Sequence, residues 1–295
     1  MNRLAAILLL SLVSLAIAPP SPRPRSQDTT ASPPSSLDAL LAKAAEYCRR
    51  LEGSAFDLTC REEISETIDP SLDAAAEPPP SNTQRTTYTG PTITISKVKK
   101  IKHRFVYDYR CVRTAQAIRE TRAQLEENGK RKVVSNAGLK TPVVDFGGAL
   151  LSPVGLFGER SRPGYDFSVA GEAQAGDTGV LVIGAKPKPE APLSRCLYGQ
   201  AWIDPATGAI LKLEWGERPA GRFEIFETRG RLYNREPRLV FSSEFGAEKN
   251  GIRFPSRQSF EESYLNDAGK VFVRSRTVAV YKDFKFLSIE VELRD

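Results

Sequence analysis

The sequence predicts a mainly β protein in which a few helices cover one large, curled antiparallel sheet. Three observations predict it. Short runs alternate between apolar and polar residues, tight turns such as Asn128-Gly129 and Asn250-Gly251 join them, and Leu197–Trp215 reads as a complete β-hairpin. Strands joined by tight turns pair antiparallel. A sheet of about ten strands rarely stays flat, so we expect an unclosed barrel or half-barrel whose concave face must be filled.

The first 36 residues are not expected to belong to this sheet. The basic start and the apolar run Leu4–Ile17 are typical of an export signal, with Ala16-Ile17-Ala18 as the cleavage site and Ser14-Leu15-Ala16 as an alternative. The run is shorter than the roughly 20 residues that span a bilayer. Residues 19–36 contain six prolines and are typical of a disordered tether. We therefore expect a signal peptide at 1–18, a tether at 19–36 and a single domain at 37–295.

An amphipathic helix is predicted over residues 35–52, because Ser35 and Asp38 form a capping box and Gly53 can end the helix. Its apolar stripe consists of Leu37, Leu40, Leu41, Ala44, Cys48 and Leu51. The period changes to two in the next segment, which predicts a strand. Its apolar face consists of Phe56, Leu58, Cys60, Ile64 and Ile68.

Four cysteines occur in a chain that is expected to reach an oxidising compartment, where disulfides form. Cys48 lies on the helix stripe and Cys60 on the strand face, so we favour a Cys48–Cys60 bridge, which leaves Cys111 to pair with Cys196. The alternative is four buried thiols. None of the spacings is that of a metal site, so no metal is expected.

The middle of the chain begins with a loop insertion at about 69–91 that contains five prolines. The strand pattern then resumes at Thr92 and continues to Cys111. Further strands are expected at Tyr165–Ala173, Val180–Ala185, Leu239–Phe245, Ile252–Leu265, Lys270–Tyr281 and Phe284–Leu293, with a short helix within Arg218–Pro237.

The formal net charge is +6, and the basic residues are spread along the chain. The densest basic cluster consists of Lys97, Lys99, Lys100, Lys102, His103 and Arg104. It suits an anionic membrane surface, or it protects an exposed edge strand against aggregation. No nucleic-acid partner is expected, because no motif of that kind is present.

The hairpin at Leu197–Trp215 supplies the candidate ligand-binding wall. Its turn is Asp204–Gly208, and pairing Asp204 with Ala209 places Trp202 opposite Leu211 and Tyr198 opposite Trp215. Apolar side chains of this hairpin then share one face. The candidate lining of the concave face consists of Tyr198, Trp202, Leu211, Leu213, Trp215, Phe254 and Phe260.

The uncharged segment Gly147–Gly158 is too short to span a bilayer. Its apolar residues are Leu150, Leu151, Val154, Leu156 and Phe157. We consider two interpretations, a mobile lid over an apolar cavity or a static plug inside the concave face.

No catalytic constellation is evident, because the chain has one histidine and no Gly-x-Ser-x-Gly motif. Glu62-Glu63 and Glu261-Glu262 are adjacent acids, but neighbours on a strand point to opposite faces, so we expect surface charge. We expect no cofactor and no enzyme, with a hydrolase on a β scaffold as the remote alternative.

Several motifs resemble one superfamily of exported bacterial proteins. They are Tyr198-Gly199, Trp202-Ile203-Asp204, Thr207-Gly208, Leu211-Lys212-Leu213-Glu214, Asn250-Gly251, Phe254-Pro255-Ser256 and Tyr281-Lys282-Asp283-Phe284. On these residues, residues 55–291 resemble a distant member of the LolA/LolB/RseB-like superfamily of lipoprotein-sorting-like proteins. The resemblance implies an unclosed antiparallel barrel covered by helices and an apolar cavity for acyl chains, lipoproteins or a regulatory partner.

Together these observations predict a non-enzymatic protein exported to the periplasm or the outside of a bacterium. It is expected to hold a lipid, an acyl chain or a lipidated polypeptide in the concave face by hydrophobic burial. The alternative is an envelope sensor or scaffold that binds another protein while its own helix plugs the concave face.

Overall fold

The computed structural model describes residues 36–54, 58–76, 98–113, 118–141, 148, 150–176, 178–190, 199–215 and 224–286. All of them belong to one compact unit, Pro34–Asp295. The expected signal peptide and tether, Lys97, Cys196, Tyr198 and most of the expected insertion lie outside the described residues. No helix in the described part of the chain is long and apolar enough to cross a membrane.

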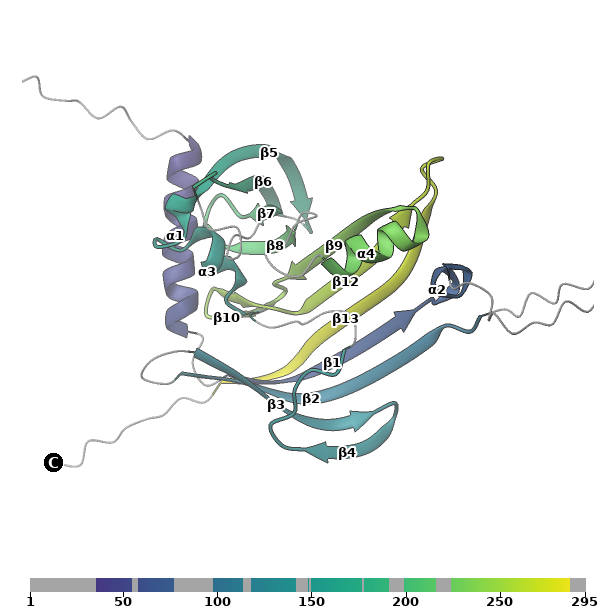
Figure 1. Ribbon diagram of the computed structural model, residues 1–295. Helices are drawn as coiled ribbons and strands as arrows, with labels where there is room; N and C mark the ends of the chain where they lie inside the picture. Colours follow the sequence, from purple (N-terminus) through teal and green to yellow (C-terminus); the bar gives the residue numbers. More distant parts are fainter. Residues whose placement is uncertain are drawn as a thin grey trace, which may run out of the picture. The chain divides into compact units, whose positions relative to one another are not determined.

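An antiparallel sheet of eleven strands forms the centre of the fold, in the order β4-β3-β2-β1-β13-β12-β9-β8-β7-β6-β5, and it does not close into a barrel (Figure 1). This confirms the predicted fold class. Its strands are β1 (Leu58–Ile68), β2 (Ile101–Arg113), β3 (Ile118–Glu127), β4 (Lys130–Val134), β5 (Tyr165–Ala175), β6 (Thr178–Pro187), β7 (Gly199–Ile203), β8 (Ile210–Trp215), β9 (Glu236–Glu244), β12 (Arg257–Leu265) and β13 (Val271–Phe286). A separate ribbon pairs β10 (Ala247–Lys249) with β11 (Ile252–Phe254).

Tight turns connect neighbouring strands, as the sequence predicts. Asn128 and Gly129 join β3 to β4, and Asn250 and Gly251 join β10 to β11, all four with positive φ. One pair inside the sheet is not joined by a tight turn. Strand β1 pairs with β13, which lies near the other end of the sequence, and Ile64 lies opposite Ala279. The strand expected at Lys270–Tyr281 and the start of the one expected at Phe284–Leu293 belong to the single long strand β13, which is irregular near Asp283; residues 287–293 lie outside the described residues.

One face of the sheet is buried and is called the inner face below. It carries residues such as Ile64, Ala279, Phe260, Leu213 and Ile183, which the strand registers place on the same side of five strands. Figure 1 shows the sheet curling so that β5–β8 come to lie beside the first helix. The inner face therefore turns toward the helices and holds the hydrophobic core.

Helix α1 (Ser36–Ser54) covers one end of the inner face. Its predicted stripe is buried, with Leu37 partly exposed, and Tyr47 joins the core beside it. The Tyr47 hydroxyl accepts a hydrogen bond from the Arg253 backbone N–H at 3.0 Å, which connects α1 to β11. The short helix α3 (Ser152–Phe157) packs against α1.

The far end of the inner face carries two other helices, α2 (Ser71–Ala76) and α4 (Glu224–Tyr233). The ring of Phe226 in α4 packs on Phe260 of β12 at 5.8 Å between ring centroids. Helices α2 and α4 contact each other. The helix expected within Arg218–Pro237 is thus present, and it closes the second end of the inner face.

The predicted Cys48–Cys60 bridge is wrong. Both cysteines are buried with free thiols, Cys48 in α1 and Cys60 in β1. Burial raises the pKa of Cys48 to about 12 and raises that of Cys60 as well, so both stay protonated at neutral pH. Cys111 is also buried in the core, and its predicted partner Cys196 lies outside the described residues.

The turn between β7 and β8 docks directly on α1. Asp204 orders the turn, since its carboxylate accepts hydrogen bonds from the Ala206 N–H at 2.8 Å and the Thr207 hydroxyl at 2.7 Å. Lys43 of α1 donates to the Pro205 carbonyl at 2.9 Å. Gly208 has φ +73°, and a Cβ there would lie 2.5 Å from the Lys43 carbonyl group. Only glycine fits this contact.

Replacing Gly208 by alanine is therefore expected to destabilise the protein by about 2 kcal/mol or more, because left-handed strain adds to a backbone clash with α1. The matched control is Gly251→Ala, which has φ +71° but open space around it, so only the strain of about 1 kcal/mol remains. Urea unfolding measures both losses. Equal losses in the two variants would contradict the close docking of the turn on α1.

Candidate functional site

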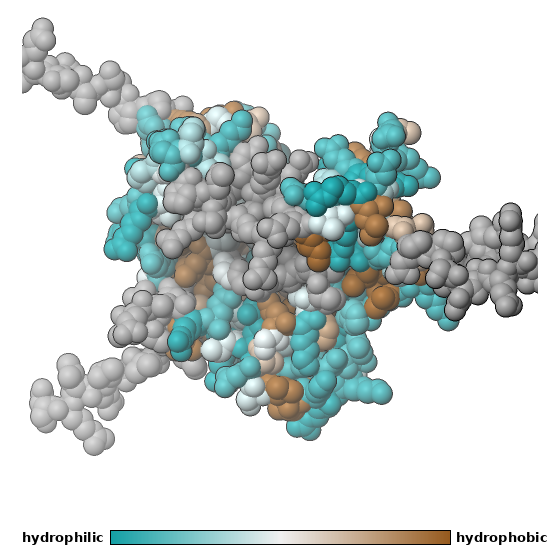
Figure 2. Space-filling view, viewed as in Figure 1, coloured by the Kyte–Doolittle hydropathy of each residue, from teal (hydrophilic) through white to brown (hydrophobic). Residues whose placement is uncertain are grey.

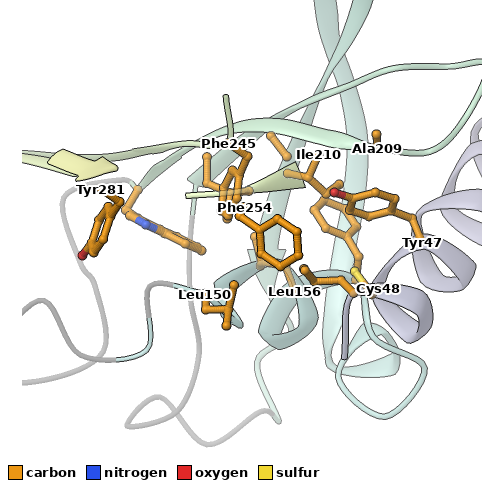
Figure 3. Packing of buried hydrophobic residues seen from close by; sticks show 14 of the residues in the cluster. Tyr47, Cys48, Leu150, Leu156, Ala209, Ile210, Phe245, Phe254 and Tyr281 are labelled. Carbon is orange, nitrogen blue, oxygen red and sulfur yellow. The ribbon is translucent and has the colours of Figure 1, made fainter. Parts of the chain in front are cut away.

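Four of the candidate lining residues are buried in the core. They lie on β8 and β12 of the large sheet and on β11 of the separate ribbon. Leu213, Trp215, Phe254 and Phe260 are all buried, at 0 to 3% exposure. Figure 3 shows Phe254 and Phe245 facing Leu156 within this core. These residues form one continuous apolar cluster with α1 and α3, as the sequence pattern predicts for a wall of the concave face.

The hairpin itself is confirmed, but its predicted register is wrong beyond the first pairs. Asp204 and Ala209 do pair, with an N–H to carbonyl distance of 3.0 Å, and Ile203 lies opposite Ile210. A bulge follows, so Trp202 lies opposite Lys212 instead of Leu211. The bulge frees the Leu211 carbonyl to accept a hydrogen bond from the Phe245 N–H at 2.8 Å.

As a consequence, Trp202 does not belong to the inner face. It is half-buried on the opposite side, where the Lys212 ammonium lies 4.3 Å from the centre of its ring. Its neighbours Ala201 and Ile203 occupy the inner face in its place, fully buried. Leu211, at the bulge, is partly buried against the core.

The segment Leu150–Phe157 covers the inner face next to α1. Leu150, Leu156 and Phe157 are at most 1% exposed, and Leu151 and Val154 pack on the core from partly exposed positions. The Phe157 ring stacks on Phe167 of β5 at 5.5 Å. Figure 3 shows Leu156 of this segment next to Cys48 of α1. In this structure the segment fills the space above the wall.

The backbone hydrogen bonds of this segment are local. The Val154 and Gly155 N–H groups donate to the Leu151 carbonyl at 3.0 and 3.2 Å, and the Gly158 N–H donates to Val154 at 3.0 Å. Apolar side chains of the segment pack it against the core. Such contacts have no directional requirement, so another apolar group can replace them.

Charged side chains are also buried on the inner face, which the sequence analysis did not expect. Glu62 of β1 is fully buried, and Arg122 of β3 binds it through two hydrogen bonds of 2.6 and 3.1 Å. The guanidinium also lies over the Tyr109 ring, 5.0 Å from its centre. Glu63 points outward to Lys282 at 2.8 Å. The prediction of opposite faces is confirmed, whereas surface exposure is wrong for Glu62.

The second acidic pair behaves in the same way. Glu262 is fully buried, and its carboxylate accepts hydrogen bonds from Arg229 at 3.0 Å and Arg274 at 3.1 Å. The hydroxyls of Tyr264 and Ser275 also donate hydrogen bonds to this carboxylate, at 2.6 and 2.8 Å.

One signal in the sequence could have identified the buried acids on β1. Glu62 and Glu66 share the parity of the apolar residues Leu58, Cys60, Ile64 and Ile68.

Arg274 links this carboxylate to α2. Arg274 donates a hydrogen bond to the Asp73 carboxylate of α2 at 2.9 Å. The Tyr233 hydroxyl of α4 also donates to the Asp73 carboxylate. Burial alone would raise the pKa of Asp73, but the hydrogen bonds from Tyr233 and Arg274 and the charge of Arg274 lower it below 3.8. The cluster of Asp73, Arg274, Glu262, Arg229 and Tyr233, called the polar clasp below, joins α2 and α4 to the sheet.

These carboxylates are poorly placed for acid–base chemistry. Both oxygens of Glu62 and of Glu262 already accept hydrogen bonds from guanidinium groups, so a substrate would have to compete with these ion pairs. Within the described residues, no group of three or more His, Cys, Asp and Glu side chains could hold a metal ion.

The basic cluster lies at the start of β2, which is an inner strand of the sheet and extends beyond β3. The register with β3 begins at Phe105, so Ile101–Arg104 lie past its end. Lys99 and Lys102 are exposed, and Lys100 pairs with Asp69 at 3.2 Å beside an open groove of about 320 Å³ between β1 and β13. The described residues on the face in Figure 2 are mainly hydrophilic, with separate hydrophobic spots.

No family model and no curated protein matches this chain. Among solved structures, it is similar to a DUF1329 family protein from Desulfovibrio piger, with 12% identity, 86% of this chain and 95% of that chain covered, and a TM-score of 0.38. A LolA superfamily protein from Nitrosomonas europaea has 10% identity, 84% and 94% coverage and a TM-score of 0.34.

A putative outer membrane lipoprotein-sorting protein domain from Vibrio parahaemolyticus has 10% identity, 86% and 95% coverage and a TM-score of 0.33. A protein of the superfamily that the sequence resembles is thus among the similar structures. At these identities and TM-scores the similarities carry no argument about a ligand or a partner.

The buried ion pair gives a first prediction. Arg122→Met should destabilise the protein by about 3–5 kcal/mol, because Glu62 would remain buried without a counter-charge. The double variant Glu62→Leu with Arg122→Met should recover much of that loss. The control is Arg276→Met, whose side chain is 60% exposed in its pair with Glu261 and should cost less than about 1 kcal/mol. Similar losses in both single variants, measured by urea unfolding, would refute this role of Arg122.

The polar clasp gives a second prediction. Because the pKa of Asp73 is lowered in the folded state, its carboxylate stabilises the protein above about pH 4. The contribution is lost as the pH falls through the lower, folded-state value. At pH 7, Asp73→Asn should cost about 1–3 kcal/mol, and the difference from wild type should shrink toward pH 3. Urea midpoints at both pH values measure this, with Glu261→Gln as the surface control. A difference that does not depend on pH would contradict it.

Proposed function

We propose that this protein is an exported, non-enzymatic binding protein that holds the acyl chain of a lipid or of a lipidated polypeptide against the inner face. Leu213, Trp215, Phe254 and Phe260 form the wall of the site. The segment Leu150–Phe157 acts as its lid.

The local hydrogen bonding of the lid carries this proposal. The pairings of the described sheet do not involve Leu150–Phe157, so the segment can leave the wall while the strand pairing stays intact. Its departure exposes apolar side chains that it packs against, among them the buried stripe of α1 and Phe167 of β5. An acyl chain can cover the apolar surface that the lid leaves. The free energy gained by burying this surface again, about 25 cal/mol per Å², then offsets the free energy lost on opening.

The surroundings of the wall suit an unreactive ligand. Two of the buried carboxylates of the inner face are paired with arginines, Glu62 with Arg122 and Glu262 with Arg229 and Arg274. An apolar wall whose neighbouring charges are already paired binds a ligand mainly by hydrophobic burial. The exposed Lys99 and Lys102 are proposed to meet an anionic membrane surface during delivery.

The direct test is native mass spectrometry of the full chain, purified under native conditions from the periplasm of an expression host. We expect co-purifying lipid, and the delipidated protein should take up a fluorescent fatty acid. A protein that is empty and also fails to bind hydrophobic probes would refute a carrier function.

Closing the lid covalently tests the mechanism. α3 packs on α1, and Leu156 lies next to Cys48, so Leu156→Cys is expected to form a disulfide with Cys48 on oxidation. The cross-linked protein should lose at least about 90% of its fatty-acid binding, and reduction should restore it. The control is Cys48→Ser with Leu156→Cys, which cannot cross-link. Full binding in the cross-linked state would show that the segment is not the lid.

A second candidate function is a scaffold whose concave face stays plugged while an outer surface binds another protein. The almost complete burial of Leu150, Leu156 and Phe157 favours it. Crosslinking in cells that captures a protein partner, together with an absence of lipid in native mass spectra, is the outcome that selects this function over the first.

A further inference from the structure

The wall of the proposed site contains one polar atom without a partner. Trp215 is the last residue of β8 and is 3% exposed. Its indole Nε1 is buried and has no hydrogen-bond acceptor among the residues that the structure describes. A buried donor left unpaired costs about 1–3 kcal/mol, so a partner is expected for it.

The indole differs from the other buried polar groups of the inner face in its rigidity. The Gln124 side chain already donates to Glu127 at 3.2 Å, and the hydroxyl of a tyrosine such as Tyr109 rotates to find an acceptor. The indole has one N–H, fixed in the plane of the ring, and it cannot be redirected unless the whole side chain moves. Trp215 is held by β8, which is paired on both sides.

The side chains in line with Trp215 on the next two strands of the inner face are aromatic. Phe241 lies directly opposite it on β9, and Phe260 of β12 lies opposite Phe241. Phe226 of α4 covers Phe260. These rings provide apolar surface and no acceptor for an N–H. In the adjacent row, Gln258 donates to Ser243 at 3.2 Å, so these polar side chains are engaged with each other. The position of Trp215 thus combines an apolar row with an unpaired donor, which is the arrangement that fixes the polar end of an otherwise apolar ligand.

We propose that Trp215 Nε1 donates a hydrogen bond to the carbonyl oxygen that joins the acyl chain of the ligand to its headgroup or polypeptide. The ligand class is then an acyl ester or an acyl amide, as opposed to an alkyl ether or a bare hydrocarbon. This inference rests on the proposed function and adds the chemical linkage that the site selects.

The test compares two lipids that differ in the carbonyl group alone, palmitoyl lysophosphatidylcholine and its hexadecyl ether analogue. Wild-type protein should bind the ester about fivefold to tenfold more tightly, the value of one hydrogen bond to a buried donor. Trp215→Phe keeps an aromatic ring but removes the N–H, so it should bind the ester with the affinity of the ether and leave ether binding unchanged. Calorimetric titration measures all four affinities.

Trp202→Phe is the matched control, because Trp202 is the other tryptophan of the chain and lies on the opposite face. It should keep the preference for the ester. If Trp215→Phe unfolds, incorporation of benzothienylalanine at this position replaces the N–H by sulfur at nearly unchanged shape.

The outcomes separate the two proposals. Equal binding of both lipids by the wild type overturns the role of Trp215, with a water as its partner, and leaves the proposed function standing. A preference for the ester that survives in Trp215→Phe also overturns it. Binding of neither lipid overturns the proposed function itself.

Discussion

The fold depends on the need to cover the apolar inner face of a sheet that does not close on itself. A closed barrel can fill its interior with its own strands, but an open one needs other elements over that face. Here α1 and α3 cover one end and α4 the other. Docking of the β7–β8 turn on α1 at Gly208 fixes how closely the first helix approaches. The positions of the wall, the lid and the core follow from this cover.

The inner face is divided between two kinds of chemistry. Near α1 it is apolar, and the contacts there are interchangeable, which suits a surface that exchanges its cover for a ligand. Toward α2 and α4 it carries the polar clasp, whose geometry is specific and whose carboxylates are costly to leave unpaired. Thus the segment proposed to open packs through apolar side chains, whereas the polar clasp at the opposite side holds α2 and α4 by directional hydrogen bonds.

The sequence predicts the fold well because alternation along strands is a local property. The strand faces, the Asn-Gly turns and the stripe of α1 all follow from neighbouring residues. The register of the β7–β8 hairpin fails at Leu211, because the bulge there serves a hydrogen bond to Phe245, more than thirty residues away. The burial of Glu62 was missed for the same reason, since its partner Arg122 is 60 positions distant. The expected Cys48–Cys60 disulfide failed for a similar reason, because the distance between two sulfur atoms in the fold does not follow from the spacing of the cysteines in the sequence.

The pairing of β1 with β13 has a consequence for how the chain acquires its structure. The two strands at the centre of the sheet are separated by some two hundred residues, so their contact must close a very long loop. Contacts of this kind form late and make folding slow. The strands on either side can pair among themselves earlier, but β1 and β12 become part of one sheet only after the last strand, β13, has emerged from the ribosome or from a translocation channel. Until β13 is in place, the edges of β1 and β12 remain exposed. The chain is therefore most prone to aggregation before β13 pairs with them.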